Sequence, residues 1–163
     1  MAKSENKASK SGGVKIIAAN RQARYQYEIL DTYEAGVVLT GTEVKSIREG
    51  KVNLGDGFAN VKRGEVWLHN VHISPHSMTN LVYNHEPRRV RKLLLHKQEI
   101  RKLIGQVEQK GLTLVPLKMY LKGGKVKVSF ALGRGKKLHD KRDSLKKKQD
   151  KRDIARAMKA ANQ

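Results

Sequence analysis

The side chains in this sequence that can do chemistry are mostly cationic, and they are densest near the C-terminus. Residues 133–163 carry 12 basic and 4 acidic side chains, and Asp140-Lys141-Arg142 recurs as Asp150-Lys151-Arg152. Lys and Arg at this density bind phosphate, with an affinity that falls as salt rises. The 163-residue chain has a net charge of +20, which implies a polyanionic partner, nucleic acid before anionic lipid.

Catalytic and metal-binding patterns do not occur in the sequence. It has no GxxxxGK[ST] phosphate loop, no HExxH motif, no supported Ser/His/Asp set and no Cys. His69, His72 and His76 suggest a metal cluster, but on a strand the first two would point to opposite faces, and Pro75 interrupts the run. We therefore predict a protein without catalytic activity, metal or cofactor.

The composition divides the chain into three parts. Residues 1–13 are polar and aperiodic, which predicts a disordered basic leader rather than a secretory signal. All 8 aromatic residues lie between Tyr25 and Phe130, so the core is expected within residues 14–133. Residues 134–163 form a basic tail. No apolar run approaches the ~20 residues that span a bilayer, so we predict a cytoplasmic protein without a membrane contact.

The middle part has the pattern of a mainly β domain. Strands are expected over residues 25–39, 58–62, 65–74, 91–95 and 117–132, with a bend at Gly36 and a hairpin turn at Gly123-Gly124. Helices are expected from a Thr42 cap to Gly50, and along the face of Ile100, Leu103, Ile104 and Val107. These elements fit a small antiparallel β-barrel of five or six strands, of the oligonucleotide-binding (OB) type, with packed helices.

Two basic surfaces follow from this arrangement. Lys118 and Lys122 share one side of their strand, as Lys125 and Lys127 do on the next, which predicts either an RNA-facing or a merely solvated sheet face. In the tail, a helix would place Ile154 and Met158 together, but this apolar stripe is too thin to dock on the barrel. We expect the tail to be disordered when free and helical when it folds against RNA, permanent disorder being the alternative.

Several segments resemble, in order and spacing, the tmRNA-binding small protein B family (SmpB, the SsrA-binding proteins). They are NRQARYQYEI, EAGVVLTGTEVKSIREGKVNL, HISP, RKLLLHKQEI, KGLTLVPLKMYLKGGKVKV and GRGKKLHDKR. The resemblance implies a non-catalytic adaptor that binds the tRNA-like domain of tmRNA, as a monomer on the RNA. Elongation factor Tu would deliver the complex to stalled ribosomes, where trans-translation tags the incomplete peptide.

The resemblance also implies which residues contact RNA. For tmRNA these are Asn20, Arg21, Arg24, Tyr25, Glu43, Lys45, Asn53, Leu94, Lys136 and Lys137. Tyr25 stands where many relatives have His; either ring can stack on a base. Glu43 would either accept a hydrogen bond from a base or orient basic neighbours, and the sequence does not choose between them.

The tail residues carried over from the resemblance belong to the decoding centre and the empty mRNA channel of the ribosome. They are His139, Asp140, Lys141, Arg142, Lys151, Arg152, Ile154 and Met158. Two other interpretations remain: a generic basic translation protein of the same barrel class, and an RNA-modifying enzyme, which the missing ligand cluster disfavours.

Overall fold

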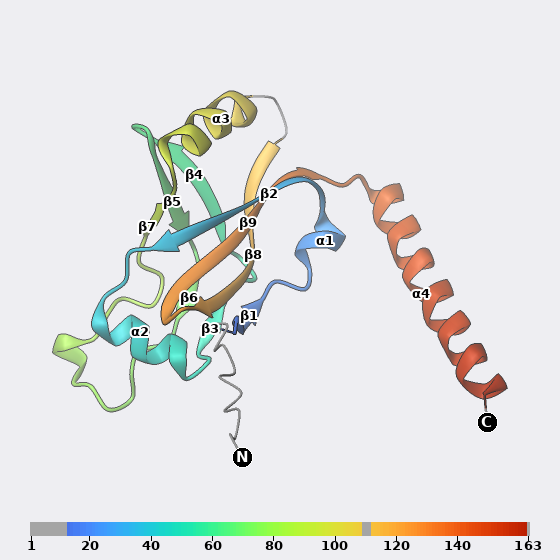
Figure 1. Ribbon diagram of the computed structural model, residues 1–163, viewed down its shortest axis with the longest axis horizontal. Coiled ribbons are helices and arrows are strands. Elements are labelled where there is room, and N and C mark those ends of the chain that lie inside the picture. The colour runs from blue at the N-terminus through green and yellow to red at the C-terminus, as the bar shows by residue number, and fades with distance from the viewer. Residues whose placement is uncertain (1–12, 109–111, 163) are drawn as a thin grey trace, which may run out of the picture.

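The computed structural model describes residues 13–108 and 112–162. It is a β-barrel with a long helix standing away from it (Figure 1). The strands are β1 (Lys15–Ala19), β2 (Tyr27–Val37), β3 (Val52–Asn53), β4 (Phe58–Lys62), β5 (Glu65–His69), β6 (His72–Ile73), β7 (Arg91–Leu94), β8 (Leu112–Lys122) and β9 (Lys125–Gly135). The helices are α1 (Ala23–Gln26), α2 (Gly41–Arg48), the 3-10 turn η1 (Leu81–Tyr83), α3 (Lys97–Val107) and α4 (Leu138–Ala161).

The barrel is a closed antiparallel ring. Its strands follow the order β8-β4-β5-β7-β2-β9, and the β8–β9 hairpin closes the circle. β1 pairs with the part of β8 that β4 leaves free, and β3 and β6 form a separate small sheet. This architecture confirms the predicted OB-type barrel with packed helices.

The core follows from the alternation of apolar side chains along these strands. On β5, Val66 and Leu68 are fully buried while their neighbours face outward. Phe130 lies at the centre, with its ring stacked on Tyr33 at 5.7 Å. α3 covers one end of the barrel and inserts the fully buried Leu103 (Figure 1). A barrel this small is filled by its own side chains, so ligands are left to its outer surface.

The β8–β9 hairpin forms where the sequence predicted it. Gly123 and Gly124 both have positive φ, 59° and 76°, which glycine adopts without steric cost. The strands pair from Lys122↔Lys125 to Leu112↔Arg134, apart from one irregularity after Pro116. The hairpin is therefore a long pair of strands, and its second strand, β9, ends just before α4.

Four local predictions were wrong in detail. The predicted strand 25–39 begins as α1, since burial of Ala23 holds one helical turn there. The register irregularity of β2 falls between Ile29 and Asp31, not at Gly36. The predicted strand 65–74 breaks at Asn70, whose φ of 56° leaves the extended region. α2 is capped at Thr40 and not at Thr42.

The two ends of the chain differ in what is described. The predicted leader falls outside the described residues except for Gly13. β9 continues to Gly135, two residues beyond the predicted boundary at 133, and α4 occupies the predicted tail. No helix in the described part of the chain is long and apolar enough to cross a membrane.

Candidate nucleic-acid interface

Asn20 fixes the turn that leads into α1. Its backbone N–H donates to the Leu117 carbonyl at 2.7 Å, and its side-chain Nδ2 donates to the Pro116 carbonyl at 3.2 Å. These bonds tie the turn to β8, so the residues that follow have a defined direction. Arg21 and Arg24 are exposed on that turn and helix.

Lys136 joins α1, β9 and α4. Its backbone N–H donates to the Gln26 carbonyl at 2.9 Å, and its ammonium donates to the Arg24 carbonyl and to Ser144 Oγ, both at 2.9 Å. The ammonium is therefore committed within the protein, where it fixes the direction in which α4 leaves the barrel. Lys137, the next residue, is exposed before the first turn of α4.

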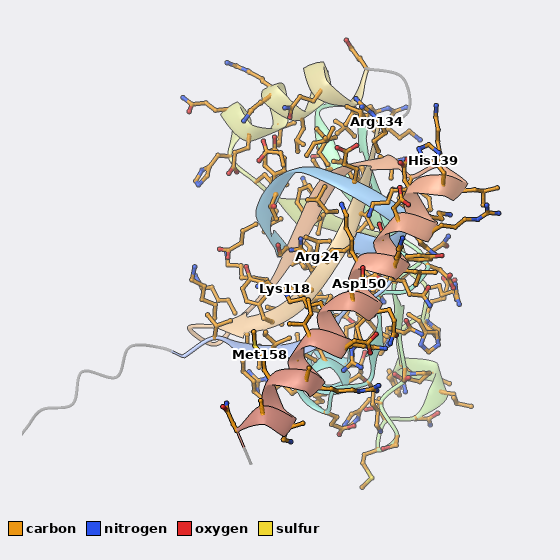
Figure 2. All side chains as sticks on the ribbon, turned by 90° about the vertical axis from the view of Figure 1, so that its right-hand side faces the viewer. Arg24, Lys118, Arg134, His139, Asp150 and Met158 are labelled. Atoms are coloured by element: carbon orange, nitrogen blue, oxygen red, sulfur yellow. The ribbon has the colours of Figure 1, made fainter. Side chains whose placement is uncertain are left out.

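Two hollows flank Lys136, and we call this region the α1–α4 junction. The first, of about 510 Å³, is lined by Arg21, Gln22, Arg24, Tyr25, Ser144, Leu145 and Lys148. The second, of about 560 Å³, includes Arg134, Lys137 and His139 together with the carboxylates of Glu28, Asp140 and Asp143. Figure 2 shows Arg24 on the barrel side of α4, and Arg134 and His139 where β9 leads into it. The first hollow combines cations with an aromatic ring, which is the chemistry that binds phosphates and stacks bases.

Glu43 lies in a different place, buried at the base of α2. Its Oε1 accepts from Arg89 Nε at 3.0 Å and Arg91 Nε at 2.9 Å. Its Oε2 accepts from Arg89 Nη2 and from the Thr40 N–H, each at 2.9 Å. Both Glu43 and Arg91 have 0% of their surface exposed. A carboxylate enclosed in this way cannot reach a base, so the geometry matches the second of the two roles considered, orienting basic neighbours.

The Glu43 carboxylate is held in its charged form. Burial by itself would raise its pKa, but the hydrogen bonds from Arg89 and Thr40 and the charges of both arginines outweigh burial, so the pKa is lowered. Arg89 stays partly exposed, with 35% of its side chain accessible. Glu43 therefore presents one cation, Arg89, at the surface and anchors another, Arg91, inside.

Leu94 and Lys45 lie on this same side of the molecule. Leu94 is 52% exposed on β7, and a hollow of about 420 Å³ places it with Val44, Lys125 and Lys127. Lys45 is exposed on α2. The hollow is apolar around Val44 and Leu94 and basic at Lys125 and Lys127, and we call it, with the neighbouring helix residue Lys45, the α2 patch.

Asn53 has a local role in the turn after β3. Its Oδ1 accepts from the Gly55 N–H at 2.8 Å, while the residue itself stays exposed. Among the residues that the structure describes, none accepts a hydrogen bond from the side-chain amide nitrogen, so it can donate to an RNA base or ribose.

Apart from Asn53, the residues predicted for one RNA surface thus fall into two groups. α1 lies beside the origin of α4, whereas α2 lies on the opposite side of the barrel (Figure 1). An RNA that contacts both must reach around the barrel.

α4 carries all the predicted tail residues. None of its side chains is buried, and Ile154 and Met158 are 57% and 65% exposed. His139 Nε2 lies 2.9 Å from Asp140 Oδ1 at its first turn. Figure 2 shows the helix running past the barrel from His139 to Met158, with Asp150 between them.

The comparisons with known proteins agree on one family. The model of the SmpB protein family matches residues 17–160. An SsrA-binding protein of Thermosynechococcus vestitus is 73% identical over 146 residues, 90% of this chain and 96% of the relative. That of Nostoc punctiforme is 70% identical over 153 residues, 94% and 99% of the two chains.

The chain belongs to the SmpB family.

A solved SmpB-related structure has the same fold. The chain aligns with one described as "tmRNA-SmpB: a journey to the center of the bacterial ribosome", with a TM-score of 0.65 and 52% identity. The alignment covers 78% of this chain and 93% of the other. SmpB proteins are RNA-binding adaptors and not enzymes.

Sequence reasoning missed the two arginines that give this SmpB chain its buried ion cluster. Arg91 shares the inward face of β7 with the fully buried Leu93, so the strand alternation in RKLLL is the signal that could have found it. Arg89 precedes the strand and has no such signal. The nearness of Lys125 and Lys127 to Leu94 was missed as well, because it depends on closure of the barrel.

The three histidines do not converge in this SmpB chain. His69 stacks on Phe58, and His76 bonds Thr79 Oγ1 at 2.9 Å. Across residues 13–108 and 112–162, no group of three or more His, Asp or Glu side chains is arranged to hold a metal ion.

Proposed function

We propose that this protein binds tmRNA and serves in trans-translation, the rescue of stalled ribosomes. The observation that carries the proposal is the α1–α4 junction. There, exposed Arg21 and Arg24 stand beside Tyr25 on a turn that hydrogen bonds hold to the barrel. Two comparisons support it, since curated relatives are named SsrA-binding proteins and the solved structure concerns tmRNA–SmpB and the ribosome.

The barrel would bind the tRNA-like domain of tmRNA. Arg21, Arg24 and Lys137 have exposed cations for phosphates, and Asn53 keeps donors for base edges or 2′-hydroxyls. Leu94 and Lys45 would add contacts from the α2 patch. Lys136 and Glu43 would act indirectly, since their charged groups are occupied within the protein.

α4 would serve the ribosome. His139, Asp140, Lys141 and Arg142 on its first turns would meet the decoding centre, and Lys151, Arg152, Ile154 and Met158 would follow the empty mRNA channel. The helix suits this role because none of its side chains is buried against the barrel. The protein would act in the cytoplasm as a monomer on the RNA, with elongation factor Tu delivering the complex.

A truncation and a double substitution separate the two roles. Removing residues 138–163 should leave binding of the tRNA-like domain within about threefold and abolish peptide tagging in a reconstituted translation system. Arg21→Ala with Arg24→Ala should instead weaken that binding by about tenfold or more, since each phosphate contact contributes to affinity. Lys97→Ala with Arg101→Ala, two exposed cations on α3, is the matched control.

Two results would contradict the proposal. Normal tagging by the truncated protein would remove the role of α4. Equal affinity for tmRNA and for bulk tRNA at about 150 mM salt, where nonspecific phosphate binding has fallen steeply, would indicate a generic basic translation protein.

A further inference from the structure

The outer face of β4, β5 and β7 carries aromatic side chains that have no part in the proposed function. Along β5 the inward residues Val66 and Leu68 are fully buried, while Trp67 and His69 face outward. This face lies on the side of the barrel away from α1 and α4 (Figure 1). It is therefore a surface distinct from the α1–α4 junction.

Two rings on this face form a stacked pair. Phe58 and His69 are cross-strand partners on β4 and β5, and their rings lie parallel within 5° at 4.9 Å. His69 Nε2 is also 2.9 Å from Asn60 Oδ1, the residue opposite Trp67. The imidazole is thus held on two sides, which prepares it to take part in binding without a large entropy cost.

A hollow of about 410 Å³ opens over Trp67 beside this pair. Its lining is Asn60, Lys62, Arg63, Glu65, Trp67, His69 and Val90. In the register Trp67 lies between Asn60 on β4 and Lys92 on β7, so the indole occupies the floor of the hollow. No hydrogen bond joins the indole N–H to another residue that the structure describes.

Charge at the rim of the hollow is positive. Glu65 is paired with Lys92, which neutralises both. Within the described residues, no ion pair joins Lys62 or Arg63 to an acid, so both cations are available at one edge. The other edge offers the Asn60 side-chain amide and the second ring nitrogen of His69.

We propose that this face binds an unpaired RNA nucleotide, with its base stacked on Trp67 and its phosphate at Lys62 and Arg63. Stacking on an aromatic ring beside cations is how proteins hold single-stranded nucleic acid. Asn60 and His69 supply hydrogen bonds at the edge of the base. An open hollow with one charged edge suits a strand passing across the sheet, and the net charge of +20 favours RNA over a cationic or neutral ligand.

The single tryptophan makes the proposal directly measurable, because all tryptophan emission comes from Trp67. Titrating the full chain with a 12-nucleotide oligouridine at about 150 mM salt should quench that emission with saturation. A duplex RNA of equal length should leave it nearly unchanged, since its bases are not free to stack. Free uridine monophosphate at the same nucleotide concentration should also have little effect.

Substitutions test whether the quenching of Trp67 emission arises from binding at this face. His69→Ala with Lys62→Ala should weaken the quenching by about tenfold, whereas the matched loss of charge in Lys97→Ala on α3 should leave it within twofold. Trp67→Ala should weaken binding of a fluorescently labelled oligouridine, measured by polarisation, and circular dichroism should confirm that each variant is folded. None of these variants should change affinity for the tRNA-like domain of tmRNA by more than twofold.

Several outcomes would overturn the proposal. Unchanged Trp67 emission at saturating oligouridine would do so, as would equal quenching by the duplex or by the free nucleotide. Equal weakening of the quenching by Lys97→Ala would mean that binding depends only on the total charge of the protein. A loss of affinity for the tRNA-like domain in the His69 variant would assign the face to tmRNA instead. Each of these leaves the proposed function itself standing.

Discussion

At the residue scale, the Glu43 carboxylate holds two arginines in place, and one of them, Arg91, is buried with it. Arg91 also donates to the Val71 carbonyl at 2.8 Å and to the Pro87 carbonyl at 3.2 Å. This cluster joins α2, β7 and the segment before β7 through charge-assisted bonds, which are stronger than neutral ones. Because both charges are out of water, removing one of them leaves the other uncompensated.

Glu43→Gln should therefore lower the free energy of unfolding by roughly 3 kcal/mol at neutral pH, measured by urea denaturation. The pKa of Glu43 in the folded protein is lowered from the ordinary value of 4.5. Its contribution is thus fully present above that value and is lost as pH falls through the lower folded-state pKa. The gap between wild type and Glu43→Gln should shrink as pH falls below 4.5.

Glu49→Gln is the control, since Glu49 is exposed near the end of the same helix and pairs with Lys51 at 3.0 Å. It should leave the free energy of unfolding nearly unchanged, because an ion pair in water contributes little to stability. A Glu43→Gln loss no larger than that of Glu49→Gln would refute the structural role of the cluster.

Gly57 lies where the packing leaves no room for a Cβ atom. A Cβ there would lie 2.8 Å from Val71 Cγ2 and 2.9 Å from Pro116 Cγ, closer than side chains allow. Gly57→Ala should cost about 1–3 kcal/mol of unfolding free energy through overpacking. Gly105→Ala, on α3 where nothing lies within 4 Å, should instead be stabilising by up to about 1 kcal/mol. Similar effects at both positions in thermal melts would contradict this reading of the packing.

At the element scale, α3 and α4 differ in what holds them. α3 places Leu103 in the core, and Tyr33 on β2 donates to Gln106 Oε1 at 2.7 Å. α4 buries none of its 24 residues, and its attachment depends on Lys136, whose ammonium bonds Ser144. A helix that buries no face must rely on its own propensity and on pairs such as Gln149 with Asp153, which contribute only tenths of a kcal/mol. These weak interactions do not determine whether α4 stays helical in the free protein, so the disorder of the free tail remains a prediction.

Removing residues 138–163 should accordingly change the free energy of unfolding of the barrel by less than about 1 kcal/mol, the value of one net hydrogen bond. Leu103→Ala on α3 should cost about 2–5 kcal/mol in the same urea titration. In the full chain, the far-ultraviolet helix signal should fall gradually on heating, before the cooperative loss of the barrel. A single joint transition, or a large loss in the truncated protein, would mean that α4 stabilises the barrel.

At the scale of the whole molecule, charge is distributed over several sides of the barrel. α1 and α4 lie on the side of the barrel opposite α2 (Figure 1), and the outer face of β4 and β5 carries the stacked pair of Phe58 and His69. A net charge of +20 attracts any polyanion, so these local arrangements of rings, hydrogen bonds and fixed cations must provide the discrimination.

The salt dependence of tmRNA binding tests this distribution. Arg21→Ala with Arg24→Ala should reduce the slope of log Kobs against log salt by about 1–2, because each lost phosphate contact removes about one released counterion. Lys97→Ala with Arg101→Ala removes the same charge from α3 and should leave the slope nearly unchanged. Equal reductions in the two variants would mean that only total charge is sensed.

The sequence by itself determined the features that depend on neighbouring residues. These features are the strand alternation, the Gly123-Gly124 turn and the apolar face of α3. Each involves residues only a few positions apart, so they could be predicted together with the barrel class. The resemblance in its motifs named the family that the comparisons confirm. The total charge follows from the composition, and the lack of catalytic motifs follows from the order of residues in the sequence.

Only the tertiary structure decided which of these residues meet. Glu43 and Arg91 are 48 positions apart, and their contact exists because β7 is drawn into the ring beside α2. Closure of the same ring divided the predicted RNA residues between two sides and turned Phe58, Trp67 and His69 outward as one surface. Such long-range contacts are set by how the barrel closes, which no local spacing of residues encodes.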